Sequence, residues 1–245
     1  MKIVQLTDLH IGLEGEDTNG VDVRGNFLNV LRHLRANPPD HLVLSGDLCF
    51  RVGTPEVYAW IREQLADLPV PIWYMSGNHD DPEMLARAFE LDGGFMQDGE
   101  LYYHAILGGR EFIFLDTTRY EMSETQFQWL RDQMEGRSDT LLVFMHHPPG
   151  LIGVPFMDNK YPLRNWAEVQ ALFLDYPGEV YVFSGHYHVD KSVHLKNLHI
   201  FVTPSTFFQI GQQAAEFRVD HYRVGWRELV WSGDAFQTTV RYLEP

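Results

Sequence analysis

Five short strings of polar residues stand out because each one directly follows a run of β-branched or aromatic residues. They are Thr7-Asp8-Leu9-His10, Ser45-Gly46-Asp47, Ser76-Gly77-Asn78-His79-Asp80, His146-His147-Pro148-Pro149 and Ser184-Gly185-His186-Tyr187-His188. Their side chains offer imidazole nitrogens and carboxylate or amide oxygens without a thiolate, a donor set that suits Mn, Fe, Zn or Co. Two carboxylates, one amide and at least four imidazoles are more ligands than a single ion uses. The count predicts two metal ions.

A pair of ions defines the chemistry that these residues could perform. Two ions about 3.5–4 Å apart need a shared anionic ligand, and Asp47 is the natural bridge. A water molecule held between them loses a proton near neutral pH and becomes a nucleophile. Because the ions also neutralise charge on phosphoryl oxygens, such a pair supports in-line attack on phosphorus.

The elements that must position these residues alternate between strands and helices. Apolar runs predict strands at Lys2 to Leu6, His41 to Leu44, Ile72 to Met75, Glu111 to Leu115, Thr140 to Met145, Val180 to Phe183 and His199 to Val202. Helix starts are indicated by Thr54-Pro55, by Asp81-Pro82 and by a capping box from Ser123 to Gln126. This alternation predicts a layered α/β fold.

The fold class explains how distant residues could meet. The carboxyl ends of strands in an α/β sheet share one edge, so the five strings are expected to converge there. Gly46, Gly77 and Gly185 precede the polar residues, where a missing Cβ allows close approach of the backbone to a ligand.

The segment after Val202 changes to short alternating runs. These predict antiparallel strands at Glu216 to Val219, Val224 to Val230 and Thr238 to Leu243, with a turn at Ser232-Gly233-Asp234. No repeat, low-complexity tract or linker divides the chain. We therefore expect a single domain over residues 1–245, with residues 203–245 as terminal antiparallel strands that complete it.

Composition limits the partners and the compartment. The 245 residues are 44% hydrophobic, enough for a real core, and 19 basic against 34 acidic residues leave a net charge of −15. This charge argues against a nucleic acid polymer but permits a small anion where metal ions supply positive charge. Cys49 is the only cysteine, which excludes an internal disulfide. Without a signal-peptide core or an apolar run of about 20 residues, a cytoplasmic chain with no membrane span is expected.

At the residues quoted above the chain resembles the calcineurin-like metallophosphoesterases. Their pattern is Asp-x-His, Gly-Asp, Gly-Asn-His-Asp or Gly-Asn-His-Glu, a later His, and Gly-His-x-His. Within that superfamily the chain is most similar to the class III cyclic nucleotide phosphodiesterases and the related glycerophosphodiesterases. Further similar strings are His146-His147-Pro148-Pro149, Leu163-Arg164-Asn165, Val202-Thr203-Pro204-Ser205-Thr206 and Tyr222-Arg223-Val224-Gly225-Trp226. The resemblance implies a four-layer αββα sandwich of two mixed sheets, two divalent or trivalent first-row ions with Fe or Mn ahead of Zn or Co, and a homodimer.

The resemblance also implies roles for individual residues. One ion would be held by Asp8, His10, Asp47 and His188, and the other by Asp47, Asn78, His146 and His186. His79 would stabilise the charged transition state or protonate the leaving oxygen, and together with Asp47 and Asn78 it forms the expected catalytic set. Asn78 and His79 would contact the phosphate, with His10 and His188 also beside the substrate. His147 would lie behind the metal ligands.

Three functions remain open at this point. The first is a dimetal phosphodiesterase that hydrolyses 3′,5′-cyclic nucleotides such as cyclic AMP to 5′-nucleotides. The second acts on glycerophosphodiesters or other lipid-derived diesters, and the third is a module that binds metal without turnover. The residues expected to separate the first two line the pocket outside the metals, with candidates Phe156, Tyr161, Asn165, Phe207, Phe208 and Gln209. The protein phosphatase motif Gly-Asp-x-x-Asp-Arg-Gly is missing, since Gly46-Asp47 continues as Leu48-Cys49-Phe50-Arg51.

Overall fold

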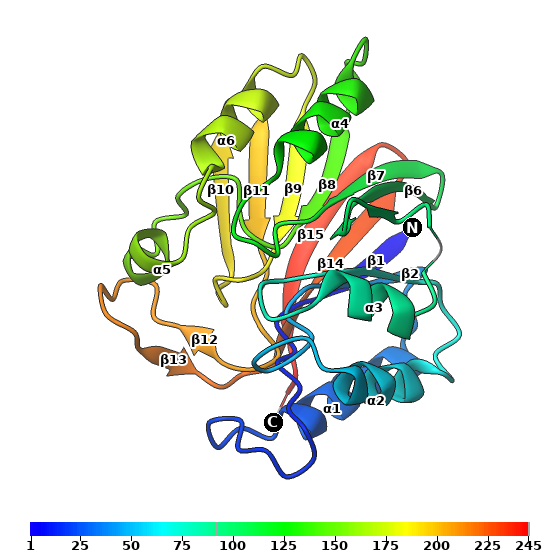
Figure 1. The fold of residues 1–245 in the computed structure, drawn as a ribbon, viewed down its shortest axis with the longest axis vertical. Helices are drawn as coiled ribbons and strands as arrows, with labels where there is room; N and C mark the ends of the chain where they lie inside the picture. The colour runs from blue at the N-terminus through cyan, green and yellow to red at the C-terminus, as the bar shows by residue number, and fades with distance from the viewer. Residues whose placement is uncertain (92, 245) are drawn as a thin grey trace.

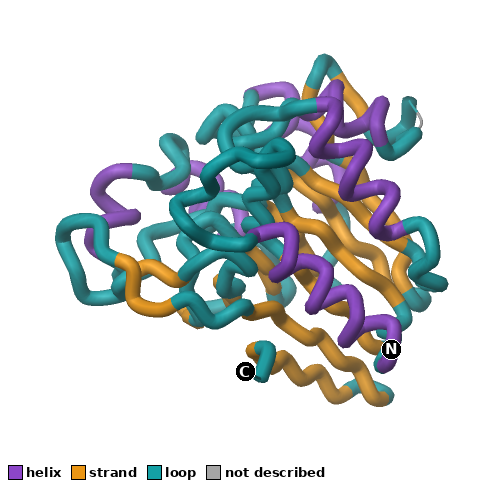
Figure 2. Tube along the Cα trace, turned by 90° about the horizontal axis from the view of Figure 1, so that it is seen from below, coloured by secondary structure: helices purple, strands orange, loops and turns teal. Residues whose placement is uncertain are grey.

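Two β-sheets pack face to face and helices cover their outer faces, as Figures 1 and 2 show. This computed structural model describes residues 1–91 and 93–244. Its helices are α1 (Val23–Ala36), α2 (Pro55–Leu65), α3 (Pro82–Ala88), α4 (Glu124–Met134), α5 (Pro155–Lys160) and α6 (Trp166–Leu174). The layered arrangement of helices around two mixed sheets confirms the expected α/β sandwich. No helix in the described ranges is both long and apolar enough to cross a membrane.

Sheet A has the strand order β15-β14-β1-β2-β3. Its strands are β1 (Lys2–Leu6), β2 (His41–Ser45), β3 (Ile72–Met75), β14 (Gly225–Ser232) and β15 (Ala235–Tyr242). β1, β2 and β3 run parallel, whereas β14 pairs antiparallel with both β1 and β15. The terminal strands are antiparallel, as the alternating pattern predicts, and they extend the sheet that contains β1.

Sheet B has the strand order β10-β11-β9-β8-β7-β6. Its strands are β6 (Tyr103–Leu107), β7 (Arg110–Leu115), β8 (Leu141–Met145), β9 (Val180–Ser184), β10 (Lys191–Leu195) and β11 (Leu198–Val202). The four central strands are parallel, with an antiparallel strand at each edge. β8 is buried along its whole length, which explains why its sequence is uninterrupted by polar residues.

Two small ribbons lie outside the sheets. They are formed by β4 (Met96–Gln97) with β5 (Glu100–Leu101), and by β12 (Gln209–Ile210) with β13 (Val219–His221). The strand expected from Glu216 to Val219 is therefore wrong except at its last residue. The chain between β12 and β13 instead folds back on itself, and the amide of Gly211 donates to the carbonyl of Arg218 at 2.8 Å.

Aromatic rings and one polar chain join the two sheets. Trp231 of sheet A packs edge-on against Phe112 of sheet B, with ring centroids 5.8 Å apart. The buried Gln5 side chain donates to the hydroxyl of Ser45 at 2.9 Å and accepts from the hydroxyl of Thr203 at 2.7 Å. Because buried polar groups cost free energy when unpaired, these bonds favour a single alignment of sheet A against sheet B.

The three expected helix starts are present, but two of the expected caps differ. The hydroxyl of Thr54 does not cap α2 and donates instead to the carbonyl of Val52 at 2.8 Å. The carboxylate of Asp81 accepts from the amide of Met84 at 2.8 Å, and the hydroxyl of Ser123 accepts from the amide of Gln126 at 3.2 Å. The Gln126 side chain does not complete a capping box, because it pairs with the backbone N–H and carbonyl of Asp116 instead. It thereby anchors α4 to the end of β7.

Candidate active site

The loops that follow β1 and β2 are hydrogen-bonded side by side beyond the end of the sheet. The amide of Asp8 donates to the carbonyl of Gly46 at 3.0 Å, and the amide of His10 donates to the carbonyl of Asp47 at 3.0 Å. A parallel bridge between Ile11 and Cys49 continues the pairing. These bonds hold the two carboxylates at one edge of sheet A, where the sequence predicts them.

Five of the expected ligand residues have left-handed backbone conformations. Their φ values are +54° at Asp8, +47° at His10, +52° at Asp47, +64° at His186 and +50° at His188. A non-glycine residue in this region costs about 1 kcal/mol or more. Such strain concentrates at functional sites, where it fixes the direction of a side chain.

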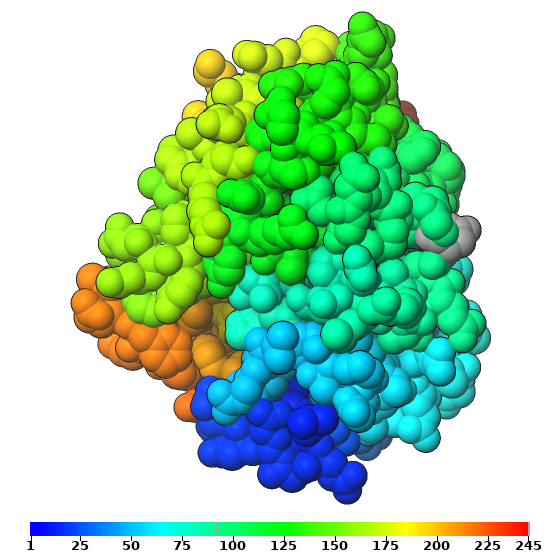
Figure 3. Space-filling view, in the orientation of Figure 1, coloured from blue at the N-terminus to red at the C-terminus, as the bar shows by residue number. Residues whose placement is uncertain are grey.

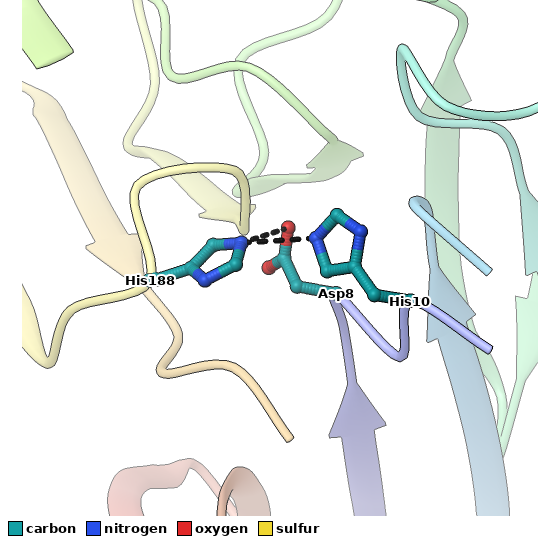
Figure 4. Close-up of side chains that lie close together, drawn as sticks. All are labelled: Asp8, His10 and His188. Carbon is teal, nitrogen blue, oxygen red and sulfur yellow. Dashed lines mark hydrogen bonds and ion pairs between the residues drawn. The ribbon is translucent and has the colours of Figure 1, made fainter. Parts of the chain in front are cut away.

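One cluster of metal-capable groups consists of Asp8, His10 and His188 (Figure 4). The Nδ1 of His188 faces the carbonyl oxygen of Phe208 at 2.9 Å. Because a carbonyl can only accept, Nδ1 carries the proton and Nε2 of a neutral His188 presents a lone pair. This Nε2 atom of His188 lies 3.1 Å from Nε2 of His10 and 3.3 Å from Oδ1 of Asp8. Such crowding of acceptor atoms fits a bound cation.

A second cluster consists of Asp47, His146 and His186. The Nδ1 of His146 donates to the carbonyl of Ser45 at 2.9 Å, so its Nε2 faces Oδ2 of Asp47 at 3.3 Å. The Nε2 of His186 donates to the carbonyl of Tyr161 at 2.9 Å, which leaves the lone pair of Nδ1 for a cation. Backbone carbonyls thus orient both rings, as they commonly do for metal-binding histidines.

Asp47 stands between the two clusters. Its Oδ2 lies 3.3 Å from Nε2 of His146 and 3.7 Å from Nε2 of His10, while its Oδ1 accepts from the amide of His79 at 2.8 Å. Asn78 lies beside them, and its buried Oδ1 has no hydrogen-bond partner in the described part of the chain. An unpaired buried oxygen is costly unless a further group, such as a cation, binds it. The donor set therefore fits two ions that share Asp47.

The charges of these groups follow from burial and from their neighbours. Burial lowers the pKa of His10 and of His186 to about 3, so both rings are neutral and can act as ligands. Burial also opposes a charge on His146, but the Asp47 carboxylate outweighs it and raises the pKa of His146 to about 9. For Asp47, burial is outweighed by His146 and His10, which hold its pKa well below the usual range.

His79 forms a further metal-capable group with His10 and Asp47, whereas His147 lies behind the ligand residues. The ring of His79 lines the cavity 4.9 Å from the ring of His10, and its Nδ1 donates to the carbonyl of Arg51 at 3.0 Å. This leaves Nε2 of His79 as the nitrogen available to a substrate. His147 is fully buried behind the ring of His186, at 4.1 Å, with Nδ1 paired to the hydroxyl of Thr117 at 2.8 Å.

A buried carboxylate that the sequence analysis did not assign ties the loops together. Asp80 accepts from the amides of Leu48 and Gly77 at 3.1 and 2.9 Å and from the hydroxyl of Tyr58 at 3.0 Å. It therefore connects the loop that carries Asp47 to the loop that carries Asn78. Burial, reinforced by the Asp47 charge, raises the pKa of Asp80 to about 6. The sequence feature that could have identified Asp80 is its place at the end of the string Gly77-Asn78-His79-Asp80.

The glycines that precede the polar residues allow close packing of the site's own side chains, whereas the sequence predicts close approach to a ligand. A Cβ at Gly185 would lie 2.8 Å from Oδ2 of Asp8 and would collide with the hydroxyl of Thr7. At Gly46, where φ is +96°, a Cβ would lie 2.5 Å from Nδ1 of His146. Both distances are shorter than carbon makes with non-bonded atoms.

The two clusters open into a cavity of about 600 Å³. Residues of the metal-capable groups line it together with Asn78: His10, Asp47, His79, His186 and His188. Among the six lining candidates, Phe156, Tyr161, Phe207 and Phe208 line the cavity. Asn165 and Gln209 have structural contacts instead: Asn165 pairs with the backbone of Met122, and Gln209 with that of Ser205. Asn19, Phe50, Tyr120 and Phe217 also line it, although no sequence pattern marked them.

Two curated relatives match this chain over almost its whole length. A "Probable cyclic nucleotide phosphodiesterase" of Fibrobacter succinogenes is 35% identical over 99% of this chain and 94% of its own length. A "3′,5′-cyclic adenosine monophosphate phosphodiesterase CpdA" of Escherichia coli is 27% identical over 98% of this chain and 88% of its own length.

A relative that matches over a shorter part of the chain and one solved structure are similar to it as well. A "Probable glycerophosphodiester phosphodiesterase GpdQ" of Arcobacter nitrofigilis is 31% identical over 64% of this chain and 61% of its own length. The crystal structure of a dimetal phosphatase from Danio rerio superposes with a TM-score of 0.71 at 13% identity, over 98% of this chain and 96% of that one, and so shares the fold. The family model described as calcineurin-like phosphoesterase matches residues 1–190. The chain therefore belongs to the calcineurin-like phosphoesterase family.

Proposed function

We propose that this protein is a dinuclear metal-dependent phosphodiesterase that hydrolyses small phosphodiesters, with 3′,5′-cyclic nucleotides such as cyclic AMP as the preferred class. The observation that carries the proposal is the pair of metal-capable clusters with Asp47 between them: its Oδ2 lies 3.3 Å from Nε2 of His146 and 3.7 Å from Nε2 of His10. Asp8, His10, Asp47 and His188 would hold one ion, and Asp47, Asn78, His146 and His186 the other. The names of relatives that match over nearly the whole chain support the cyclic nucleotide class.

The ions, when bound, would supply Lewis-acid chemistry: they lower the pKa of water and neutralise charge on phosphoryl oxygens. The side chains would do the rest. Nε2 of His79 would contact the phosphate and hold or deliver a proton at the leaving oxygen, and the amide of Asn78 would help to orient the phosphate. The bond from the His79 amide to Oδ1 of Asp47 keeps the ring of His79 at a fixed place relative to the clusters.

A reconstitution assay tests the proposal. Chelator-stripped protein should be inactive, and activity against cyclic AMP should return with Mn²⁺, Fe²⁺, Co²⁺ or Zn²⁺ at two ions per chain, measured on the same sample. Failure to hydrolyse any diester with any of these ions would refute it. One ion per chain at full activity would refute the dinuclear part alone.

A second substrate class has its own support. A glycerophosphodiesterase of Arcobacter nitrofigilis matches at 31% identity, although over only 64% of this chain. The specificity constants for cyclic AMP and for glycerophosphoethanolamine, measured with one preparation, decide between the two classes. A cytoplasmic location and a homodimer stay predictions, which cell fractionation and light scattering would test.

A further inference from the structure

Six aromatic side chains that line the cavity form a continuous wall. We call them the aromatic wall: Phe50, Phe207, Phe208, Phe217, Phe156 and Tyr161. They come from four separate places in the chain: the loop after β2, the segment before β12, the turn between β12 and β13, and α5 with the residue that follows it. Figure 3 shows the outer two of these segments, α5 and the β12–β13 ribbon, side by side at one edge of the molecule.

The rings touch one another in sequence. Centroid distances are 5.8 Å from Phe50 to Phe207, 4.2 Å from Phe207 to Phe208 and 5.8 Å from Phe208 to Phe217. Phe156 continues the wall, 5.6 Å from Phe217 and 5.6 Å from Tyr161. All of these distances lie within the range of aromatic contact.

The inner end of the wall rests on the metal-capable histidines. The ring of Phe207 lies 5.2 Å from that of His10, and the ring of Phe208 lies 5.1 Å from that of His188. A diester whose phosphorus sits at the clusters would therefore extend one ester group along the aromatic wall.

The outer end of the wall is exposed. Phe217 is 53% and Tyr161 43% accessible, whereas Phe207 is 2% accessible. The amide of Phe156 donates to the carbonyl of Ala214 at 3.2 Å, which joins α5 to the turn that carries Phe217. Large apolar side chains held exposed beside a cavity are typical of a ligand-binding surface.

The chemistry of the wall limits what it can bind. Among the described residues, Asp47 is the one carboxylate that lines the cavity, and it belongs to the metal-capable groups. A cationic head group would therefore have only the faces of the rings as partners there. A glycerol group needs hydrogen bonds, and within the wall the hydroxyl of Tyr161 is the only polar side-chain group. A flat heteroaromatic ring, by contrast, gains from stacking on phenylalanine and needs no charge.

We propose that the aromatic wall is the subsite for the nucleobase of a nucleotide diester, with Phe217 as the residue that closes over the base at the outer end. This inference rests on the proposed function for the position of the phosphate. It names which part of the molecule distinguishes a nucleotide diester from a glycerophosphodiester, and it assigns the selectivity to residues outside the metal clusters.

The test uses adenosine, which has the base and the sugar but no phosphate. With the Mn²⁺-loaded full chain, calorimetry should detect adenosine binding, and Phe217→Ala should weaken it about tenfold, as expected for the loss of one stacking contact. The KM for cyclic AMP should rise by a similar factor while kcat stays within about twofold, and Phe217→Trp should restore both values. Tyr222→Ala is the matched control, because Tyr222 is a 60% exposed aromatic residue outside the cavity.

The results separate this inference from the proposed function. No adenosine binding by the wild-type protein, or equal binding by Phe217→Ala, would overturn the inference even if cyclic AMP is hydrolysed. If Phe217→Ala raised the KM for glycerophosphocholine and left the KM for cyclic AMP unchanged, the inference would also be overturned, in favour of a site for a cationic head group. Lack of activity towards every diester would refute the proposed function, while adenosine binding would still decide the role of the wall.

Discussion

Substitution of one glycine behind the clusters should disturb both of the proposed metal ions at once. A Cβ at Gly77 would collide with Oδ1 and with the backbone nitrogen of Asp47, and it would lie 2.9 Å from Cγ of the same residue. The backbone of Gly77 has no positive φ, so alanine is compatible with its local conformation. Gly77→Ala therefore acts through the collision with Asp47 and not through strain at residue 77 itself.

The size of the effect follows from what Asp47 contacts. Overpacking of a close contact costs about 1–3 kcal/mol. For a chain of this length that corresponds to a fall in Tm of about 2–12 °C. Because Oδ2 of Asp47 faces both clusters, its displacement should weaken both ions, and disturbing the support of a metal ligand lowers affinity about 10- to 100-fold.

The assay measures metal content, thermal unfolding and diesterase activity on the same preparations. Gly93→Ala is the matched control, since a Cβ there meets no other described residue within 4 Å and its φ is not positive. We expect the control to retain wild-type values in all three measurements. A Gly77→Ala protein that binds two ions with wild-type affinity and unfolds at the wild-type temperature would refute this account of Asp47.

Three further predictions concern His79, His146 and Cys49. His79→Ala should lower kcat about 10²- to 10⁴-fold with unchanged metal content, because each proposed ion has four other ligands and the ring of His79 faces the cavity. His79 also lies within ligand distance of His10 and Asp47, so an equal loss of metal would reassign it as a ligand. The pKa of His146 is raised to about 9, so a cation must displace a proton to bind there. The apparent metal affinity should therefore increase about tenfold per pH unit from pH 6 to 8, and a metal affinity independent of pH would contradict this. Cys49 is 1% exposed and burial raises the pKa of its thiol, so this thiol should react with a thiol reagent at pH 8 only after denaturation. Fast reaction of the native protein would contradict this and show that the loop beside Asp47 opens.

The convergence of the site could be predicted from the sequence because it depends on topology. Asp8, Asp47 and Asn78 follow three adjacent parallel strands, and the carboxyl ends of such strands meet at one edge. The same reasoning brought His146 and His186 to the corresponding edge of sheet B. What it could not provide was the backbone conformation that turns each side chain towards a shared centre, since a left-handed φ at Asp8 or His188 leaves no pattern in the sequence.

The elements that the pattern missed have weak local signals. α6 is apolar on almost every side, so its sequence has no clear helical stripe. β10 is an edge strand with mostly exposed polar residues, and it is defined by its pairing with β11. Phe217 lies in a turn among charged neighbours, and only the folded chain brings it to Phe208 and Phe156.

The division of the metal-capable residues between two sheets has a consequence for the order of events during folding. Asp8, His10, Asp47 and Asn78 follow strands of sheet A, whereas His146, His186 and His188 follow strands of sheet B. Neither cluster is complete until the two sheets have docked, and the first and last of these residues are separated by nearly the whole family domain. A metal ion therefore cannot nucleate this chain in the way that zinc nucleates a small finger domain. It should instead bind late and stabilise an interface that the hydrophobic core has already assembled. Removal of metal should therefore leave the refolding rate unchanged and increase the unfolding rate.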